Sequence, residues 1–361
     1  MPVNAKIFRG TPRNLARLAR ALIEGEVVAV PTETVYGLAG DALNESAVEK
    51  IFRAKGRPAN DPLIVHLHSL KQLDQLAETN PAVEKIARAF WPGPLTIVLP
   101  KKPTVPDLVT SGRPSVAIRM PRHPLFRKLL RACGRPLAAP SANPFGYISP
   151  TSAAHVADSL GKKIRYILDG GDCAIGLEST ILDLRDPKHP AILRPGAIER
   201  RAIERVLRIK VKPAHGETVK STKAAVAPGL LARHYSPRTP IKLYDQLPDH
   251  ADIGRDGSPG RPSTLPALHI ADASERRPYH RSVDAFLYFR RPAEFAKGRA
   301  PKNIFWLSEK GELATSAKNL FAKLRALDQG KWTLIHAERA PGDNALALAI
   351  NDRLTRAAAK R

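Results

Sequence analysis

Short apolar segments alternate with stretches of helical periodicity along the first two hundred residues, and this alternation restricts the chain to an α/β fold. Helices are predicted from Thr11 and Pro12, which suit an N-cap and a first helical position, and over 45–54, 81–90, 125–133 and 152–160. Strands are predicted at 26–30, 63–66, 95–100, 115–119, 137–139, 166–168, 180–184 and 191–194. The last two strands are too close for a helical crossover, so we expect a mixed sheet.

The periodicity stops after residue 207 and starts again at residue 241. The intervening residues, 208–240, are rich in Pro, Lys, Thr and Ala, which is typical of a linker. The second half then predicts helices over 313–327 and 345–358 and strands at 241–244, 267–270, 285–289, 303–307 and 333–336. We therefore expect a first domain over 1–207, a linker over 208–240, and a smaller Rossmann-like α/β domain over 241–361.

Length and composition agree with two folded domains. The chain has 361 residues, 43% of them hydrophobic, which is enough for two cores. Its apolar runs are far shorter than the roughly 20 residues that span a bilayer, and its N-terminus does not look like a signal peptide. Two cysteines, Cys133 and Cys173, fit a reducing compartment. We therefore expect a cytoplasmic protein without a membrane partner.

The formal charge of +24 indicates anionic partners, but it is spread about evenly along the chain. Weak RNA binding, a proteome-wide preference for arginine, and a nucleotide substrate each account for it.

The usual nucleotide and metal motifs are missing from the sequence. It contains no G-x-x-x-x-G-K-[ST] loop, no G-x-G-x-x-G after a strand, no Cys/His group with zinc spacing and no G-x-S-x-G elbow. His66 and His68 share one face of a predicted strand, but no third ligand accompanies them, so we predict no protein-held metal.

Polar residues instead gather at the ends of four predicted strands. Each has an ordinary structural explanation: cations at a helix C-terminus for Lys55 and Arg57, a turn for Ser141 and Asn143, and β-formers for the threonines. These explanations do not account for the same chemistry at four strand ends, which converge on one crevice in an open α/β sheet. Arginine suits bidentate contact with phosphate or carboxylate, so the sequence predicts a pocket for a polyanion.

Six segments resemble the motifs of YrdC-like domains in order and spacing. The family's K-x-R and S-x-N patterns fall on Lys55, Arg57, Ser141 and Asn143. Two later segments, "APGLLARHYSPRTP" and "AINDRLTRAA", resemble the linker and the C-terminal end of two-domain threonylcarbamoyl-adenylate synthases. The six first-domain motifs are "PTETVYGL", "RPxxxPLIVH", "FWPGPLT", "VAIRMP", "APSAN" and "LESTILDL".

The resemblance implies a YrdC-like twisted mixed sheet and an enzyme, a nucleotidyltransferase that joins L-threonine, bicarbonate and ATP with release of pyrophosphate. Mg²⁺ would enter with ATP. Partner proteins would then transfer the threonylcarbamoyl group to the adenosine beside the anticodon of tRNA. No covalent enzyme intermediate is needed, which agrees with the missing catalytic triad.

The resemblance also implies residue roles, carried over by position. Lys55 and Arg57 would be catalytic, and Tyr235 in the linker would fold back over the nucleotide. Asp61 departs from the family, in which an amide or basic residue is expected near ATP, so its ATP contact is in doubt. L-Threonine would meet Thr34, His66, Arg119, Ala139 and Ser179, and ATP would meet Arg57, Asp61, Ser115, Ser141, Asn143, Ser149, Arg194 and Tyr235.

Two other functions compete with this one. An RNA-binding or ribosome-associated module would use the basic concavity, but backbone binding requires only distributed Lys and Arg rather than a full set of pocket residues. A carbamoyl-transfer domain of a hydrogenase-maturation protein would be accompanied by zinc fingers and an acylphosphatase unit, and the sequence shows neither.

Overall fold

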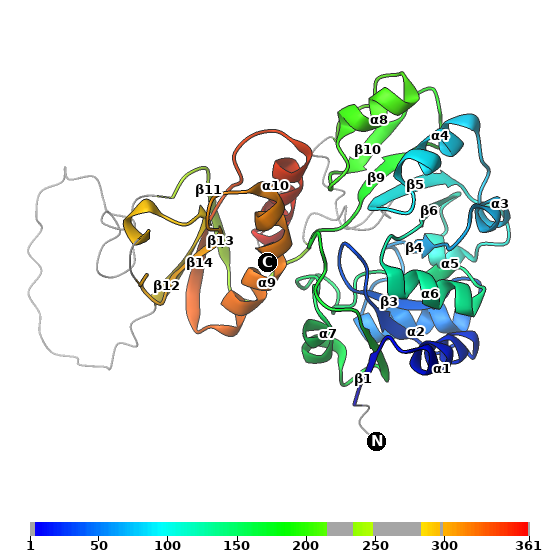
Figure 1. Ribbon diagram of the computed structural model, residues 1–361, viewed down its shortest axis with the longest axis horizontal. Coiled ribbons are helices and arrows are strands. Elements are labelled where there is room, and N and C mark those ends of the chain that lie inside the picture. The colour runs from blue at the N-terminus through cyan, green and yellow to red at the C-terminus, as the bar shows by residue number, and fades with distance from the viewer. Residues whose placement is uncertain (1–3, 215–233, 248–282, 297–298, 360–361) are drawn as a thin grey trace, which may run out of the picture.

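Ten strands of the first half of the chain form one mixed sheet. The computed structural model describes residues 4–214, 234–247, 283–296 and 299–359 (Figure 1). The strand order is β1-β8-β2-β3-β7-β4-β6-β5-β9-β10. The strands are β1 (Lys6–Arg9), β2 (Val28–Val30), β3 (Gly37–Asp41), β4 (Ile64–His66), β5 (Leu95–Pro100), β6 (Ser115–Arg119), β7 (Leu137–Ala138), β8 (Tyr166–Asp169), β9 (Thr180–Asp183) and β10 (Ala191–Arg194).

Four helices of this unit, α1, α2, α4 and α7, begin at a residue whose side chain caps them. Thr11 Oγ1 accepts from the amide of Asn14 at 3.3 Å, Asn44 and Asn80 cap two further helices, and Gly56 ends one of them with φ 62°. The helices are α1 (Pro12–Ile23), α2 (Glu45–Lys55), α3 (Leu73–Leu76), α4 (Pro81–Phe90), α5 (Asp107–Thr110), α6 (Pro124–Cys133), α7 (Ala153–Leu160) and α8 (Arg200–Leu207), with a 3-10 turn η1 (Leu70–Gln72).

The predicted α/β class and mixed sheet are confirmed. Each predicted element that falls on described residues is present within two residues of its expected bounds, and β9 and β10 pair antiparallel as their spacing requires. The elements β1, β3, α3, α5 and α8 were not predicted. Gly37 and Gly40 both lie in β3, where a Cβ on Gly37 would come within 3.2 Å of Ala139 Cβ.

The second unit is a smaller parallel sheet in the order β11-β14-β12-β13, covered by two helices. This agrees with the predicted Rossmann-like class, although the predicted strand 267–270 lies outside the described residues. The elements are β11 (Ile241–Tyr244), β12 (Val283–Arg290), η3 (Ala293–Phe295), β13 (Ile304–Ser308), α9 (Leu313–Gln329), β14 (Trp332–Glu338) and α10 (Ala345–Ala357).

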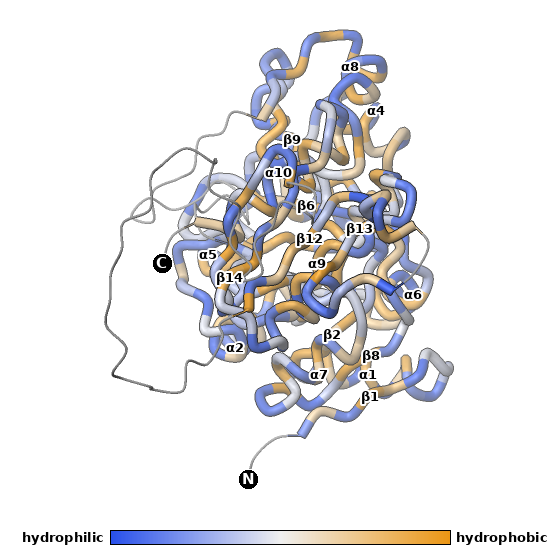
Figure 2. The backbone as a smooth tube through the Cα atoms, turned by 90° about the vertical axis from the view of Figure 1, so that its left-hand side faces the viewer, coloured by the Kyte–Doolittle hydropathy of each residue, from blue (hydrophilic) through white to orange (hydrophobic). Residues whose placement is uncertain are grey.

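The two units share an apolar cluster at their junction. Helices α9 and α10 lie on the side of the small sheet that faces the first unit (Figure 1). Val35, Ile148 and Leu177 of the first unit pack with Leu320 and Phe321 of α9. Apolar residues line the inner strands of both units, as Figure 2 shows by colour. Close approach at this junction leaves no room for a side chain at residue 176, a glycine whose Cβ would lie 2.5 Å from the backbone of α9.

Candidate functional site

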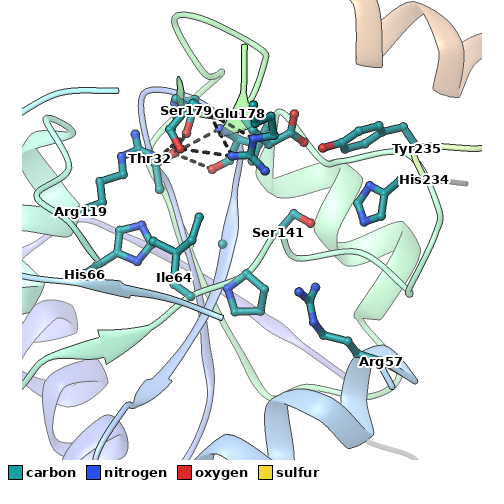
Figure 3. Close-up of a pocket in the computed structure, with 16 residues that line it drawn as sticks. Thr32, Arg57, Ile64, His66, Arg119, Ser141, Glu178, Ser179, His234 and Tyr235 are labelled. Carbon is teal, nitrogen blue, oxygen red and sulfur yellow. Dashed lines mark hydrogen bonds between the residues drawn. The ribbon is translucent and has the colours of Figure 1, made fainter. Parts of the chain in front are cut away.

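One pocket of the first unit collects nine of the fourteen residues that the resemblance singles out. It is closed by the linker residues His234 and Tyr235 (Figure 3). In the close-up, His66 and Arg119 lie at one end, Arg57 and His234 at the other, and Ser141 between them. The lining residues are Thr32, Thr34, Val35, Gly37, Arg57, Ile64, His66, Arg119, Ala139, Pro140, Ser141, Glu178, Ser179, Arg194, His234 and Tyr235.

Arg119, at the carboxyl end of β6, is held rigidly at the first end of the pocket. Its Nε donates to the carbonyl of Gly93 at 3.2 Å and its Nη1 donates to Thr34 Oγ1 at 2.9 Å. Its Nη2 lies 2.7 Å from Glu33 Oε1, in a pair that is almost fully buried. Burial raises the pKa of Glu33, but Arg119 outweighs it and leaves that pKa below its usual value. Glu33 is therefore an ionised carboxylate that orients Arg119.

The hydroxyls beside Arg119 are also fixed. Thr32 Oγ1 and Thr34 Oγ1 are 2.7 Å apart, and Thr32 Oγ1 donates to the carbonyl of Val35. Ser179 Oγ lies 2.8 Å from Thr96 Oγ1 on β5. This end of the pocket thus offers one guanidinium and several hydroxyls, which suits a small ligand with a carboxylate and a hydroxyl.

His66 lies next to Arg119, because β4 and β6 are parallel neighbours that pair these two residues in register. Burial, together with the charge of Arg119, lowers the pKa of His66 to about 3. The imidazole is therefore neutral at physiological pH, and it packs against the ring of Phe126 at 5.5 Å.

The buried neutral state of His66 predicts a pH-dependent loss of stability. The folded pKa lies below the ordinary value of 6.5, so the unfolded chain binds more protons and the free energy of unfolding falls as pH drops from about 6.5 toward 3. Between pH 7.5 and pH 5.5 we expect His66 to account for about 1.4 kcal/mol of this loss. Denaturant titrations at both pH values should show a smaller loss for His66→Phe.

The matched control is His189→Gln, on the exposed turn between β9 and β10. It should retain the loss of the unaltered protein. An equal loss in His66→Phe and in the unaltered protein would mean that His66 is protonated in the folded state.

At the other end of the pocket, Arg57 is fixed by the turn that follows α2. Its Nε and Nη2 donate to the carbonyls of Asp61 and Pro62, and Nη2 lies 2.9 Å from Asp61 Oδ2. Asp61 is fully buried and does not line the pocket. The structure thus places the aspartate behind Arg57, where it neutralises and orients the guanidinium.

Lys55 and Asn143 also lie behind the pocket wall. Lys55 Nζ donates to the carbonyls of Ser141 and Asn143 at 2.5 and 2.6 Å, and Asn143 Nδ2 donates to those of Pro144 and Tyr147 at 2.8 Å. Burial, with a smaller contribution from Arg57, lowers the pKa of Lys55 well below its usual value. Two N–H donors satisfy both carbonyls in either protonation state. Lys55 of the K-x-R motif and Asn143 of the S-x-N motif therefore stabilise the same loop, the one that carries Ser141.

Arg194 lines the pocket and contacts Ser179. Its Nε and Nη2 donate to the carbonyl of Ser179 at 3.2 and 3.1 Å, and Nη2 also reaches Ser179 Oγ at 3.2 Å. Arg194 thereby fixes the residue that contributes a hydroxyl to the first end.

Ser115 and Ser149 do not line the pocket. Ser115 begins β6, four residues before Arg119 and hence about 13 Å from it along the strand. Ser149 is fully buried and donates through Oγ to Glu178 Oε1 at 2.6 Å. Any ATP contact of Ser149 therefore involves Glu178 as well.

The linker enters the pocket through His234 and Tyr235. Both are buried, and Tyr235 adopts the left-handed backbone conformation with φ 61°. A non-glycine residue in this conformation carries strain of about 1–3 kcal/mol, which the surrounding contacts must offset. The amide of Ser236 donates to the carbonyl of Gly146, so the linker is tied to the loop after the S-x-N motif.

Sequence reasoning missed Glu33, Glu178 and His234 as site residues. The available signal was position, since each adjoins a residue that was assigned: Thr34, Ser179 and Tyr235. Among the described residues, no group of three His, Cys, Asp or Glu side chains could hold a metal ion. No described helix is long and apolar enough to cross a membrane.

Two family models together match nearly the whole chain. A Sua5/YciO/YrdC model, described as telomere recombination, matches residues 20–196, and a model described as the C-terminal domain of threonylcarbamoyl-AMP synthase matches residues 198–359.

Two relatives are similar to this chain over nearly their full length. Proteins named threonylcarbamoyl-AMP synthase from Pyrococcus abyssi and Bacillus subtilis are 39% and 40% identical, covering 96% of this chain and 94% and 93% of the relatives. A crystal structure of P. abyssi Sua5 complexed with L-threonine matches with a TM-score of 0.81 and 36% identity over 98% of both chains. The chain therefore belongs to the threonylcarbamoyl-AMP synthase family and carries both of the domains that its family models describe.

Proposed function

We propose that this protein is an L-threonylcarbamoyladenylate synthase that uses L-threonine, bicarbonate and ATP and releases pyrophosphate. The observation that carries this proposal is its similarity, over nearly its full length, to two proteins named threonylcarbamoyl-AMP synthase. We assign catalysis to residues 1–207, with residues 208–240 as a linker that crosses the site and residues 241–361 as a second domain.

The L-threonine site lies at the Arg119 end of the pocket. Arg119 binds the carboxylate, because its guanidinium is aimed by Glu33 and is only 3% exposed. Thr34 and Ser179 supply hydroxyl contacts, neutral His66 and Ala139 form the adjoining wall, and P. abyssi Sua5 was crystallised with the same amino acid.

The ATP site lies at the Arg57 end of the same pocket. Arg57 and Arg194 offset phosphate charge, and Ser141 and Tyr235 line the space between them. ATP enters as its Mg²⁺ complex, with the ion held by phosphate oxygens and water, which is how Mg²⁺ is bound in many nucleotide sites. Asp61 is already paired with Arg57 at 2.9 Å and keeps that guanidinium oriented toward the nucleotide.

The reaction needs positioned reactants more than a protein nucleophile. The amine of L-threonine attacks bicarbonate and forms a carbamate with loss of water. A carbamate oxygen then attacks the α-phosphorus of ATP, the bond to the β-phosphate oxygen breaks, and pyrophosphate leaves. The pocket orients both reactants and neutralises their charge, with Arg119 at L-threonine and Arg57 at ATP.

The linker acts as a lid over this reaction. With His234 and Tyr235 in place, the free space in the pocket is about 50 Å³, below the roughly 300–1,000 Å³ of typical ligand sites. The linker therefore moves aside for ATP to enter and returns to exclude water from a product that is easily hydrolysed.

The product carries an activated threonylcarbamoyl group, so it requires an acceptor. We propose that partner proteins transfer this group to the adenosine beside the anticodon of tRNA. The charge of +24 also allows weak contact with RNA.

The test is pyrophosphate release by the purified full-length protein. We expect release with ATP, Mg²⁺, L-threonine and bicarbonate together, and only background when any one of the three substrates is left out. No release from the complete mixture, with RNA bound at physiological salt, would favour the RNA-binding module. Pyrophosphate release from ATP with carbamoyl phosphate, in the absence of L-threonine and bicarbonate, would favour the carbamoyl-transfer reaction.

A further inference from the structure

Two buried arginines of the second domain reach into the first domain and converge on Ser149. Arg353 belongs to α10 and Arg325 to α9, and the two are 0% and 5% exposed. Ser149 is predicted to contact ATP, and both arginines act on it from a different domain, Arg325 directly and Arg353 through Glu178. This arrangement raises the question of what the second domain does for the nucleotide site.

Arg353 makes three contacts with the catalytic side of the molecule. Its Nε donates to Glu178 Oε2 at 3.1 Å, and its Nη1 donates to the carbonyl of Pro195 at 2.6 Å. Its guanidinium carbon lies 5.8 Å from the ring centre of Tyr235, within cation–π range. One side chain thus touches the pocket wall, the residue after Arg194, and the linker.

Glu178 transmits this contact to Ser149. One carboxylate oxygen accepts from Arg353, and the other accepts from Ser149 Oγ at 2.6 Å. Because both partners are charged or strongly polar and the carboxylate is buried, its orientation determines where the Ser149 hydroxyl points.

Arg325 fixes the backbone of the same residue. Its Nε donates to the carbonyl of Ser149 at 3.3 Å and its Nη2 donates to that of Ile148 at 2.5 Å. Its Nη1 reaches Ser159 Oγ at 2.8 Å. The second domain therefore holds the carbonyl of Ser149 directly through Arg325, and its hydroxyl indirectly, through the contact of Arg353 with Glu178.

Docking of the two domains does not require these charges. An apolar cluster that includes Ile148, Leu177 and Phe321 already joins them. A buried ion pair contributes little net stability compared with apolar residues of similar volume, because both charges lose their water. An arginine–glutamate pair at this place is better explained by the geometry that it imposes than by adhesion.

We propose that Arg353 is a positioning residue for ATP, which acts through Glu178 on Ser149 and through direct contact on Pro195 and Tyr235. The second domain thereby contributes to the nucleotide end of the pocket, while the residues assigned to L-threonine all belong to the first domain. This inference rests on the proposed use of ATP.

The experiment compares ATP and L-threonine dependence in the full-length protein. Arg353→Met keeps a long unbranched side chain and removes the donors, and it should raise the KM for ATP about 10-fold or more while the Kd for L-threonine stays within about twofold. Arg353→Lys keeps a charge and should lie between Met and the unaltered protein. Arg339→Met, in the same domain but paired within it to Asp245, is the control and should change neither constant.

A second substitution separates positioning from general damage. In Glu178→Gln the side-chain amide still accepts the hydrogen bond from the Ser149 hydroxyl, but it is uncharged and no longer needs a cationic partner. Glu178→Gln combined with Arg353→Met should therefore restore part of the ATP affinity that Arg353→Met alone loses. Glu178→Gln by itself tests the same connection if Arg353→Met does not fold, and it should raise the KM for ATP by a smaller factor.

Three outcomes would overturn the inference. They are an unchanged KM for ATP in a folded Arg353→Met or Glu178→Gln variant, an equal weakening of ATP and L-threonine, and no recovery in the double variant. Failure of the unaltered protein to release pyrophosphate from ATP would instead contradict the proposed function, so the two failures are distinguishable.

Discussion

Replacement of Arg119 by alanine is expected to weaken L-threonine binding about 100-fold or more, because truncation of one partner of a buried charge pair costs about 3–5 kcal/mol. Two losses combine in this variant. The carboxylate of the ligand loses its guanidinium, and Glu33 becomes a buried carboxylate without a cation. Calorimetric titration with L-threonine measures the effect directly.

The control for this substitution is Arg122→Ala. Arg122 lies three residues beyond Arg119 and outside the pocket. It is exposed, and its Nε donates to the carbonyl of Pro92. It should bind L-threonine like the unaltered protein. Affinity within about threefold of normal in Arg119→Ala, a difference of only about 0.6 kcal/mol, would place the amino acid elsewhere.

Replacement of Lys55 by alanine is expected to lower the rate of pyrophosphate release about 100-fold. Lys55 satisfies the carbonyls of Ser141 and Asn143, and a buried carbonyl left without a donor costs about 1–3 kcal/mol. The loop would relax to find other donors and carry Ser141 away from the nucleotide. Since Lys55 lies outside the pocket lining, the loss arises from loop geometry rather than from a missing reactive group.

Steady-state rates and thermal melting should be measured together for this variant. Lys50→Ala is the control, since Lys50 lies on the same helix but pairs at the surface with Glu26. Its rate should be normal. A normal rate in Lys55→Ala, with an unchanged melting temperature, would show that the loop does not depend on this lysine.

The fold could be predicted to the extent that each element carries a local signal. The β9–β10 hairpin followed from apolar runs with a short separation, and the start of α1 from its Thr11 cap and the proline at its first position. The strand β3 carried no such signal, because its sequence "GLAGD" contains two glycines. Glycine is unfavourable in a strand on its own, and it is found there when another part of the chain must approach closely. That approach, by Ala139, is a tertiary contact that the local sequence does not express.

The candidate site, too, could be predicted only in part from the sequence. Strand-end chemistry located Arg119 and His66, which the register of β4 and β6 then placed side by side. The resemblance supplied Lys55 and Asn143 but not their position behind the wall. Glu178 adjoins the assigned Ser179, but its pairing with Arg353 could not be predicted from sequence, because the two residues are 175 positions apart and lie in different domains. Pairs of this separation become visible only when the chain is folded.

The shared apolar cluster at the junction has a consequence for how such a protein changes over time. Val35, Ile148 and Leu177 are buried in an apolar cluster to which α9 contributes Leu320 and Phe321. A substitution that enlarges one of them needs an answering substitution in the other half of the gene. The two halves are therefore expected to evolve together as one unit, and an exchange of either half with a distant relative would join surfaces that no longer fit.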